Sequence, residues 1–303
     1  MDGESFALVL LAGAKWITYV GLVGLTGAVA VRRLTSTAGG DASGGAVERR
    51  LGMLAAGSAA ILVVGTAARL TAQTWSVFGL DEPVTLELVR IIGMESRWGG
   101  NWRPQAGFAL LAVVAVAVSA RRPRFGWWIA VLAVAGAWIT LPMTGHAMSF
   151  ESRLPWVAQV AHGVGAGAWI GGLAVLTAVV SGLAREPSGH GRTAGLAVEF
   201  SPMALVAVGA IVLSGALMSY LYLRAPADLW ITGYGRVLLL KVVLFLGTGA
   251  VGACNWRILL PRLGNEPGTR ALLRSARLEL ALAAGVLLVT SVLVHLAMPA
   301  EMG

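Results

Sequence analysis

Long, unbroken hydrophobic stretches separated by short polar segments dominate the chain. Eight of them cover residues 5–31, 51–73, 105–120, 126–145, 154–184, 200–223, 235–258 and 278–298. A helix needs about 20 apolar residues to cross the hydrocarbon core of a membrane. The runs are continuously apolar and do not alternate as barrel strands do, so helices are favoured. The pattern predicts an all-α polytopic bundle of eight transmembrane helices.

The composition agrees with this pattern and excludes several classes of protein. Apolar residues make up 57% of the 303 residues and charged ones 13%, whereas soluble domains carry about 45–50% and 25%. A soluble enzyme is therefore excluded, and the single cysteine excludes an internal disulfide. Basic stripes with interleaved aromatics, typical of nucleic-acid binding, do not occur. We expect one membrane domain over residues 1–303 with lipid around it, and neither catalytic residues nor a nucleic-acid partner.

The distribution of charge predicts the orientation in the membrane. The loops after the first, third, fifth and seventh spans hold 14 arginines, and the opposite side holds seven. The positive-inside rule then places both termini on the periplasmic side of a bacterial cytoplasmic membrane. The chain starts with Met1-Asp2-Gly3-Glu4, not with a basic segment, so we expect the first run to be a retained helix and not a signal peptide.

Two local patterns predict structure and not chemistry. Asp81-Glu82-Pro83 is a helix-start pattern, and the apolar and charged residues after it indicate a short amphipathic helix on the membrane surface. Gly163, Gly167 and Gly171 recur every fourth position, which lets another helix approach closely. We interpret the glycines as a packing seam beside His162.

Ionisable residues within the spans are costly and mark functional sites. In the predicted topology they gather in the outer half of the membrane: Lys15, Arg69, His146, His162, Lys241 and His295. The inner half holds little besides Cys254 and, at one end, Glu279. Six polar side chains at one depth on six helices predict a common internal site.

Methionines near two of these histidines suggest which metal the site takes. Met143 precedes His146 by three residues and Met298 follows His295 by three, a spacing that shares a helix face; Met148 lies close by. Imidazole with thioether suits copper, whereas zinc more often takes carboxylate or thiolate. We therefore predict a copper site with the ligands His146, His162, His295, Met143, Met148 and Met298.

Other interpretations of the same residues stay open. Methionine is a common packing residue, a membrane histidine can simply hydrogen-bond a neighbouring helix, and Lys15, Arg69 and Lys241 repel a cation. One alternative is a redox protein that holds haem b between two histidines, with these basic groups on its propionates. Another is a non-transporting assembly subunit.

Several motifs resemble the copper resistance protein D (CopD) family of bacterial inner-membrane proteins. They are Thr144-Gly145-His146-Ala147, His162 through Trp169 to Gly171-Gly172, Phe200-Ser201-Pro202-Met203, Leu213-Ser214-Gly215, Tyr234-Gly235-Arg236 through Lys241, Asn255-Trp256-Arg257 and Pro261-Arg262. The resemblance covers residues 144–297; the first three runs are similar only in being apolar, with a basic residue in the first.

The resemblance implies an eight-helix protein that takes part in copper uptake or resistance, with a periplasmic copper carrier as partner. His146, His162, Trp169, Tyr234, Arg236 and Lys241 match family motif positions. Many relatives carry a fused periplasmic copper-binding β-domain, but we expect neither such a domain nor a Met- and His-rich tail here, because the 303 residues leave no room for them. The resemblance therefore leads us to expect that a separate protein delivers the copper.

Overall fold

The computed structural model describes residues 3–37, 44–79, 83–186 and 189–301, and this part of the chain is all-α. Within it, eight helices are long and apolar enough to cross a membrane, as the hydrophobic pattern predicts. They are α1 (Gly3–Thr37), α2 (Gly44–Phe78), α4 (Arg97–Ser119), α5 (Pro123–Thr140), α6 (Leu154–Ala166) with the π-helical turn Gly167–Gly171 and α7 (Gly172–Leu183), α8 (Gly189–Tyr222), α10 (Gly233–Cys254) and α11 (Glu266–Leu293).

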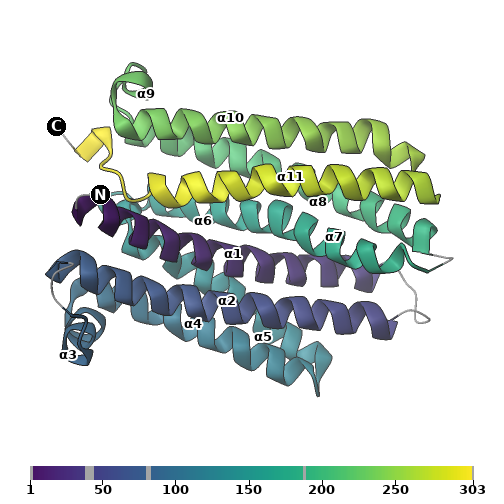
Figure 1. The fold of residues 1–303 in the computed structure, drawn as a ribbon, viewed down its shortest axis with the longest axis horizontal. Helices are drawn as coiled ribbons and strands as arrows, with labels where there is room; N and C mark the ends of the chain where they lie inside the picture. Colours follow the sequence, from purple (N-terminus) through teal and green to yellow (C-terminus); the bar gives the residue numbers. More distant parts are fainter. Residues whose placement is uncertain (1–2, 38–43, 80–82, 187–188, 302–303) are drawn as a thin grey trace.

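The helices run side by side, and α1 lies in the middle of the bundle (Figure 1). It packs against α2, α5, α7 and α11, and its Leu22 and Leu25 are fully buried. The first and last described residues lie at the same end, which we call the termini end. The opposite end carries the arginine-rich connections, and we call it the basic end.

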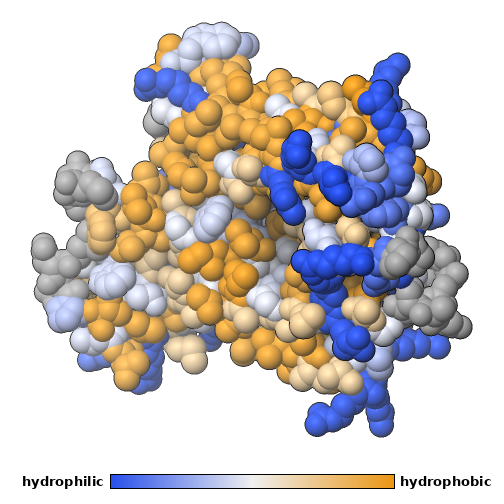
Figure 2. Space-filling model, turned by 45° about the vertical axis from the view of Figure 1, so that its right-hand side comes forward, coloured by the Kyte–Doolittle hydropathy of each residue, from blue (hydrophilic) through white to orange (hydrophobic). Residues whose placement is uncertain are grey.

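The surface of the bundle has the distribution that a membrane requires. Figure 2 shows a broad hydrophobic band, with the most hydrophilic side chains gathered at the basic end. Large apolar side chains such as Val206, Leu213 and Val243 are well exposed on this band. In water these exposed side chains would favour aggregation. In a membrane they contact lipid tails, which are equally apolar.

The glycine pattern on the fifth span forms a packing seam, as predicted. A Cβ on Gly171 would collide with the main-chain carbonyl of Val23, and one on Gly27 would collide with the main chain of Gly171. Gly167 likewise faces the side chain of Thr26. The backbones of α1 and the fifth span therefore touch directly, which only glycine permits.

The helix-face argument for the two Met–His pairs is wrong, because both helices end earlier than the hydrophobic pattern suggests. The α-helix α5 ends at Thr140, a 3₁₀ turn follows over Leu141–Thr144, and extended Gly145 separates that turn from His146. Pro142 lacks the N–H that would continue the α-helix. The paired residues Met143 and His146 therefore do not share one helix face.

The eighth membrane span, α11, also ends before its histidine. The α-helix α11 stops at Leu293, and His295 lies in the turn that follows, four residues before Pro299. Its ring Nδ1 donates to the carbonyl of Ser291, 2.8 Å away, an acceptor that the ended helix leaves available. His295 and Met298 are therefore not one helical turn apart, as the spacing argument assumed.

A short helical segment on the loop between α2 and α4 is confirmed. It comprises α3 (Leu86–Arg90) and a π-helical turn (Ile91–Glu95), with the Thr85 hydroxyl accepting from the backbone of Leu88 at 3.3 Å. Asp81 and Glu82, which we expected to begin it, lie outside the described residues. Leu86 is 89% exposed and Ile92 is buried, so one side of the segment faces away from the bundle.

Candidate functional site

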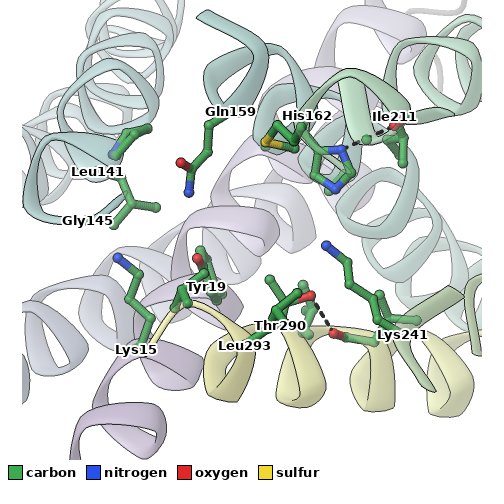
Figure 3. A pocket seen from close by; sticks show the side chains of 18 of the residues that line it. Lys15, Tyr19, Leu141, Gly145, Gln159, His162, Ile211, Lys241, Thr290 and Leu293 are labelled. Atoms are coloured by element: carbon green, nitrogen blue, oxygen red, sulfur yellow. Dashed lines mark hydrogen bonds between the residues drawn. The ribbon is translucent and has the colours of Figure 1, made fainter. Parts of the chain in front are cut away.

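A cavity of about 560 Å³ lies inside the bundle towards the termini end. Its wall is built by α1, α2, α6 with the π-helical turn after it, α8, α10 and α11, together with Trp98 of α4, Trp138 of α5 and the loop after α5. Most lining residues are apolar, and the polar side chains converge on the interior (Figure 3). A volume of this size is typical of small-molecule sites, which lie between helices in bundles.

The structure brings most of the predicted polar residues to this one cavity. The lining includes Lys15, Arg69, His162, Tyr234, Lys241 and His295. The His146 side chain lies outside the described part of the chain, although its neighbour Gly145 lines the cavity. Residues from six segments that are far apart in the sequence therefore surround a single space.

His162 is held by α8 across the cavity wall. Its Nδ1 lies 3.2 Å from the carbonyl oxygen of Ile211 and 3.1 Å from the hydroxyl oxygen of Ser214. A carbonyl oxygen only accepts, so Nδ1 carries the proton and Nε2 carries the lone pair. Figure 3 shows the second ring nitrogen on the cavity side. This anchoring of one nitrogen while the other stays available is how proteins orient metal-binding histidines.

Two basic side chains from α1 and α2 are buried in the wall. Lys15 is 5% exposed, with its Nζ 5.6 Å from the centre of the Tyr19 ring. Arg69 is also 5% exposed; it donates to the Gln105 side-chain oxygen and, at 2.6 Å, to the Thr144 hydroxyl. The guanidinium lies 5.7 Å from the Trp98 ring centre. Lys15 therefore lies near an aromatic ring, Arg69 lies near neutral oxygens and an aromatic ring, and no carboxylate among the described residues pairs with either.

Lys241 supplies a third cation from the opposite wall. It belongs to α10, and Figure 3 shows its amino group directed towards the His162 ring. Lys15 and Lys241 are the chain's two lysines, while all other basic residues are arginines. Both lysines line the cavity, so every lysine side chain of the protein belongs to the site.

The three methionines of the predicted copper site lie outside the described lining of the cavity. Met298 is fully buried in a small cluster with Tyr222, Tyr234 and Leu293, and Met148 is 41% exposed on the loop after α5. Neither these two nor Met143 belongs to the described lining of the cavity. Met218 of α8, which the sequence analysis did not consider, does line it.

No group of three or more His, Cys, Asp or Glu side chains suited to a metal ion occurs in the described part of the chain. His162 and His295 are the imidazoles that the described cavity wall offers, and Met218 adds a thioether. Arg236, which matches a family motif, is exposed near the start of α10 and bonds the carbonyl of Thr232 at 3.3 Å. It does not belong to the described lining.

Sequence reasoning missed several polar side chains of the site. Gln159 lines the cavity one turn before His162, and Tyr19 lines it one turn after Lys15. The spacing rule that we applied to the methionines would have found both. Gln105 gave no such signal, because it stands alone in its apolar run and is fully buried against Arg69.

A second buried polar group lies nearer the basic end, where the sequence analysis expected few polar side chains. The Glu279 carboxylate of α11 is 2% exposed and accepts from the Asn255 amide at 2.8 Å. Trp169, which lines the cavity, also lies within interaction distance of this carboxylate. The indole of Trp169 therefore separates the cavity from the Glu279–Asn255 pair.

Comparison with sequence families gives two matches that together span most of the chain. The family described as "Copper resistance protein D-like, N-terminal domain" matches residues 4–156, and "Copper resistance protein D" matches residues 194–293. The first match covers half of the chain, including the first three spans, where the motifs showed no specific resemblance. No solved structure is significantly similar to the chain.

Two curated proteins are similar to the chain. The copper transport protein CutJ of Bacillus subtilis is 33% identical over 216 residues, which are 68% of this chain and 38% of that protein. The inner membrane protein YebZ of Escherichia coli is 28% identical over 208 residues, which are 67% of this chain and 70% of that protein. The chain therefore spans well under half the length of the first relative and about two thirds of the second.

Proposed function

Because this chain belongs to the copper resistance protein D family, a family of multi-pass membrane proteins, we propose that it binds copper and takes part in copper uptake or resistance at the bacterial cytoplasmic membrane. The copper ion is the cargo. It enters the cavity at the termini end and is bound by His162. The protein acts by binding and passage, not by catalysis.

The observation that carries this proposal is the orientation of His162. Its Nδ1–H is fixed on the Ile211 carbonyl, and its Nε2 lone pair lies on the cavity side. Imidazole suits both copper states, and the fixed ring avoids the loss of side-chain entropy on binding. Copper transport is also what the name of the relative CutJ states for that protein.

Further ligands come from the same region of the protein. His295 and Met218 line the cavity and add an imidazole and a thioether, a donor pair that favours Cu(I). We keep His146 in the proposed set, since the adjacent Gly145 lines the cavity. Met143, Met148 and Met298 lie off the described lining, so they would bind copper only after the loops at the termini end rearrange.

We further propose that the termini end faces the periplasm. The eight spans return the chain to the side on which it starts, and the arginine-rich basic end then faces the cytoplasm. The cavity is thereby open to copper from the periplasm, with a separate periplasmic copper-carrier protein as its source. For passage onward, Glu279 and Asn255 offer a buried, hydrogen-bonded polar pair next to Trp169, nearer the basic end.

The test measures copper per chain in purified protein after anaerobic loading with Cu(I) and removal of excess metal. Replacing His162 with Ala should abolish stoichiometric binding. The matched control is His190→Ala, because His190 bonds Thr269 at 3.0 Å near the basic end, away from the cavity. Size-exclusion chromatography establishes that both variants are folded. Equal copper content in wild type and the His162 variant would overturn the assignment.

A haem-binding redox function is the second candidate. It is favoured by the presence of two imidazoles, His162 and His295, and of basic side chains in the wall of one cavity. An absorption spectrum of the purified protein separates the two functions. A Soret band that disappears in the His162 variant would support the haem function. If protein expressed with ample haem shows no Soret band, the haem function is excluded and copper binding stays the proposal.

A further inference from the structure

The cavity wall carries three basic side chains, Lys15, Arg69 and Lys241, and none of them forms an ion pair within the part of the chain that the structure describes. Lys15 and Arg69 are each 5% exposed, and Lys241 lies on the α10 wall of the same cavity, with its amino group directed towards the His162 ring (Figure 3). The ion pairs found in the described part of the chain join other residues, all of them Arg–Glu pairs away from the cavity. For Lys15, no hydrogen-bond acceptor is found among the described residues either. A buried cation without a counter-charge is costly, so a bound anion would stabilise it.

Much of the remaining wall is apolar, and the wall opens towards the lipid. Helix α10 packs closely on α11 but makes at most marginal contact with α8. Val212 of α8 and Val242 and Leu246 of α10 line the cavity and are also 49%, 42% and 61% exposed. These three residues border both the cavity and the hydrocarbon region, so the gap between α8 and α10 is a lateral opening.

The cavity is also elongated along the membrane normal. Its lining on α10 runs from Tyr234 to Leu246, twelve positions, or about 18 Å at the helical rise of 1.5 Å per residue. The charged residues occupy the part nearer the termini end, and the deeper part is lined by Phe245, Leu246 and Val286. One end of the space therefore suits an anion, and the other suits a hydrocarbon chain.

We propose that this cavity binds an acyl-chain anion. Its carboxylate or phosphate group lies among Lys15, Arg69 and Lys241, and its chain extends along the deeper wall and out between α8 and α10. The apolar walls and the lateral opening exclude a small inorganic anion as the preferred ligand, because such an ion would leave the deeper space unfilled. The same chemistry is offered by a free fatty acid and by an anionic phospholipid.

Equilibrium binding to delipidated, metal-free protein in detergent tests the proposal. The probes are radiolabelled palmitate and radiolabelled phosphatidylglycerol, with hexadecanol as the uncharged chain and inorganic phosphate as the chainless anion. We expect saturable binding of palmitate, phosphatidylglycerol or both, which identifies the source, and competition by neither hexadecanol nor phosphate. Absence of saturable binding for both labelled probes, or equal competition by hexadecanol, would overturn the proposal.

Variants locate the bound head group. Lys241→Gln and Lys15→Gln should each weaken binding about tenfold, as expected for the loss of one charge-assisted contact of about 1.4 kcal/mol. Lys241→Arg should retain binding. Arg236→Gln is the matched control, since it removes an exposed cation of α10 outside the described cavity lining. Unchanged affinity in both lysine variants would contradict the proposed position.

A measurement on the wild-type protein makes the result independent of how the variants fold. The given sequence contains two lysines, and both line the cavity, so acylation at each can be followed separately from that of the N-terminal amine. Bound palmitate or phosphatidylglycerol should slow acylation of Lys15 and Lys241 by an amine-reactive ester, about tenfold at ten times the dissociation constant, and leave the N-terminal amine unaffected. Because no metal is present, failure of the copper proposal would not change this outcome.

Discussion

The His162 ring and the Ser214 hydroxyl lie 3.1 Å apart, and this contact links the cavity wall of α6 to α8. The Ser214 hydroxyl also donates to the carbonyl of Ala210, 2.5 Å away, so its oxygen is an acceptor towards Nδ1–H. Together with the Ile211 carbonyl, it holds the proton on Nδ1. The side chain that we propose as copper ligand thus has its tautomer fixed by the neighbouring helix.

Replacing Ser214 with Ala should lower the affinity for Cu(I) by about 10- to 100-fold, the usual effect of losing a group that orients a metal-bound histidine. Competition with a chromogenic Cu(I) chelator measures the change. Ser201→Ala on the same helix is the control, because the Ser201 hydroxyl bonds the carbonyl of Ala197 away from His162. Equal loss of affinity in both variants would attribute the effect to α8 as a whole.

Removing the charge of Lys241 should have the opposite effect on copper. Its amino group is directed towards His162, so it repels a cation bound there (Figure 3). Lys241→Gln should therefore raise the affinity for Cu(I) by about tenfold, or ~1.4 kcal/mol, in delipidated protein. Lys241→Arg, which keeps the charge, should bind as wild type does. Weaker binding in the Gln variant would instead indicate that Lys241 helps to hold the metal site together.

Hydrophobic patterning was sufficient to predict the eight spans because the membrane imposes one strict requirement on every segment. It also predicted that Lys15, Arg69 and Lys241 occupy one end of the bundle, since the depth of a residue follows from its distance to the span end. It did not give helix ends. The breaks at Gly145 and after Leu293 depend on local turns and nearby prolines, which hydropathy does not register.

Which residues line the cavity could not be predicted from the hydrophobic pattern of the sequence. Spacing within one helix cannot show which residues on different helices face each other, so Met218 and Gln105 were missed. The proposed ligands Met143, Met148 and Met298 rested on the predicted topology and on their positions near two histidines in the sequence. Glu279 was noticed at a span end, but its partner Asn255 belongs to another helix and became visible only in three dimensions.

The contact between α1 and the fifth span should tolerate no side chain. Gly171→Leu would push the Val23 and Gly27 backbones apart, and overpacking of this kind costs about 1–3 kcal/mol or more. Thermal unfolding in detergent should show a clear loss of stability. Gly13→Ala on α1 is the control: a Cβ there meets no atom within 4 Å, and alanine favours the helix by about 1 kcal/mol. A stable Gly171 variant would contradict the seam.

Glu279 should matter for stability through Asn255. Glu279→Ala leaves the buried Asn255 amide without its acceptor, and we expect a loss of about 1–3 kcal/mol. Glu266→Ala removes an exposed ion pair with Arg270 on the same helix and should cost under about 1 kcal/mol. Thermal unfolding of the two variants measures the difference. Equal stabilities would mean that water enters the Glu279 site and replaces the lost partner.

The proposed orientation has a direct chemical test. In a Cys254→Ala background, a cysteine at Ser149, exposed on the loop after α5, should react with a membrane-impermeant maleimide in intact spheroplasts. A cysteine at Glu266, exposed at the start of α11, should react only after the membrane is opened. The physical basis is the excess of arginine at the basic end, which the positive-inside rule retains in the cytoplasm. The reverse labelling pattern would place the His162 cavity towards the cytoplasm, and periplasmic copper would then have to reach it from the opposite side of the membrane.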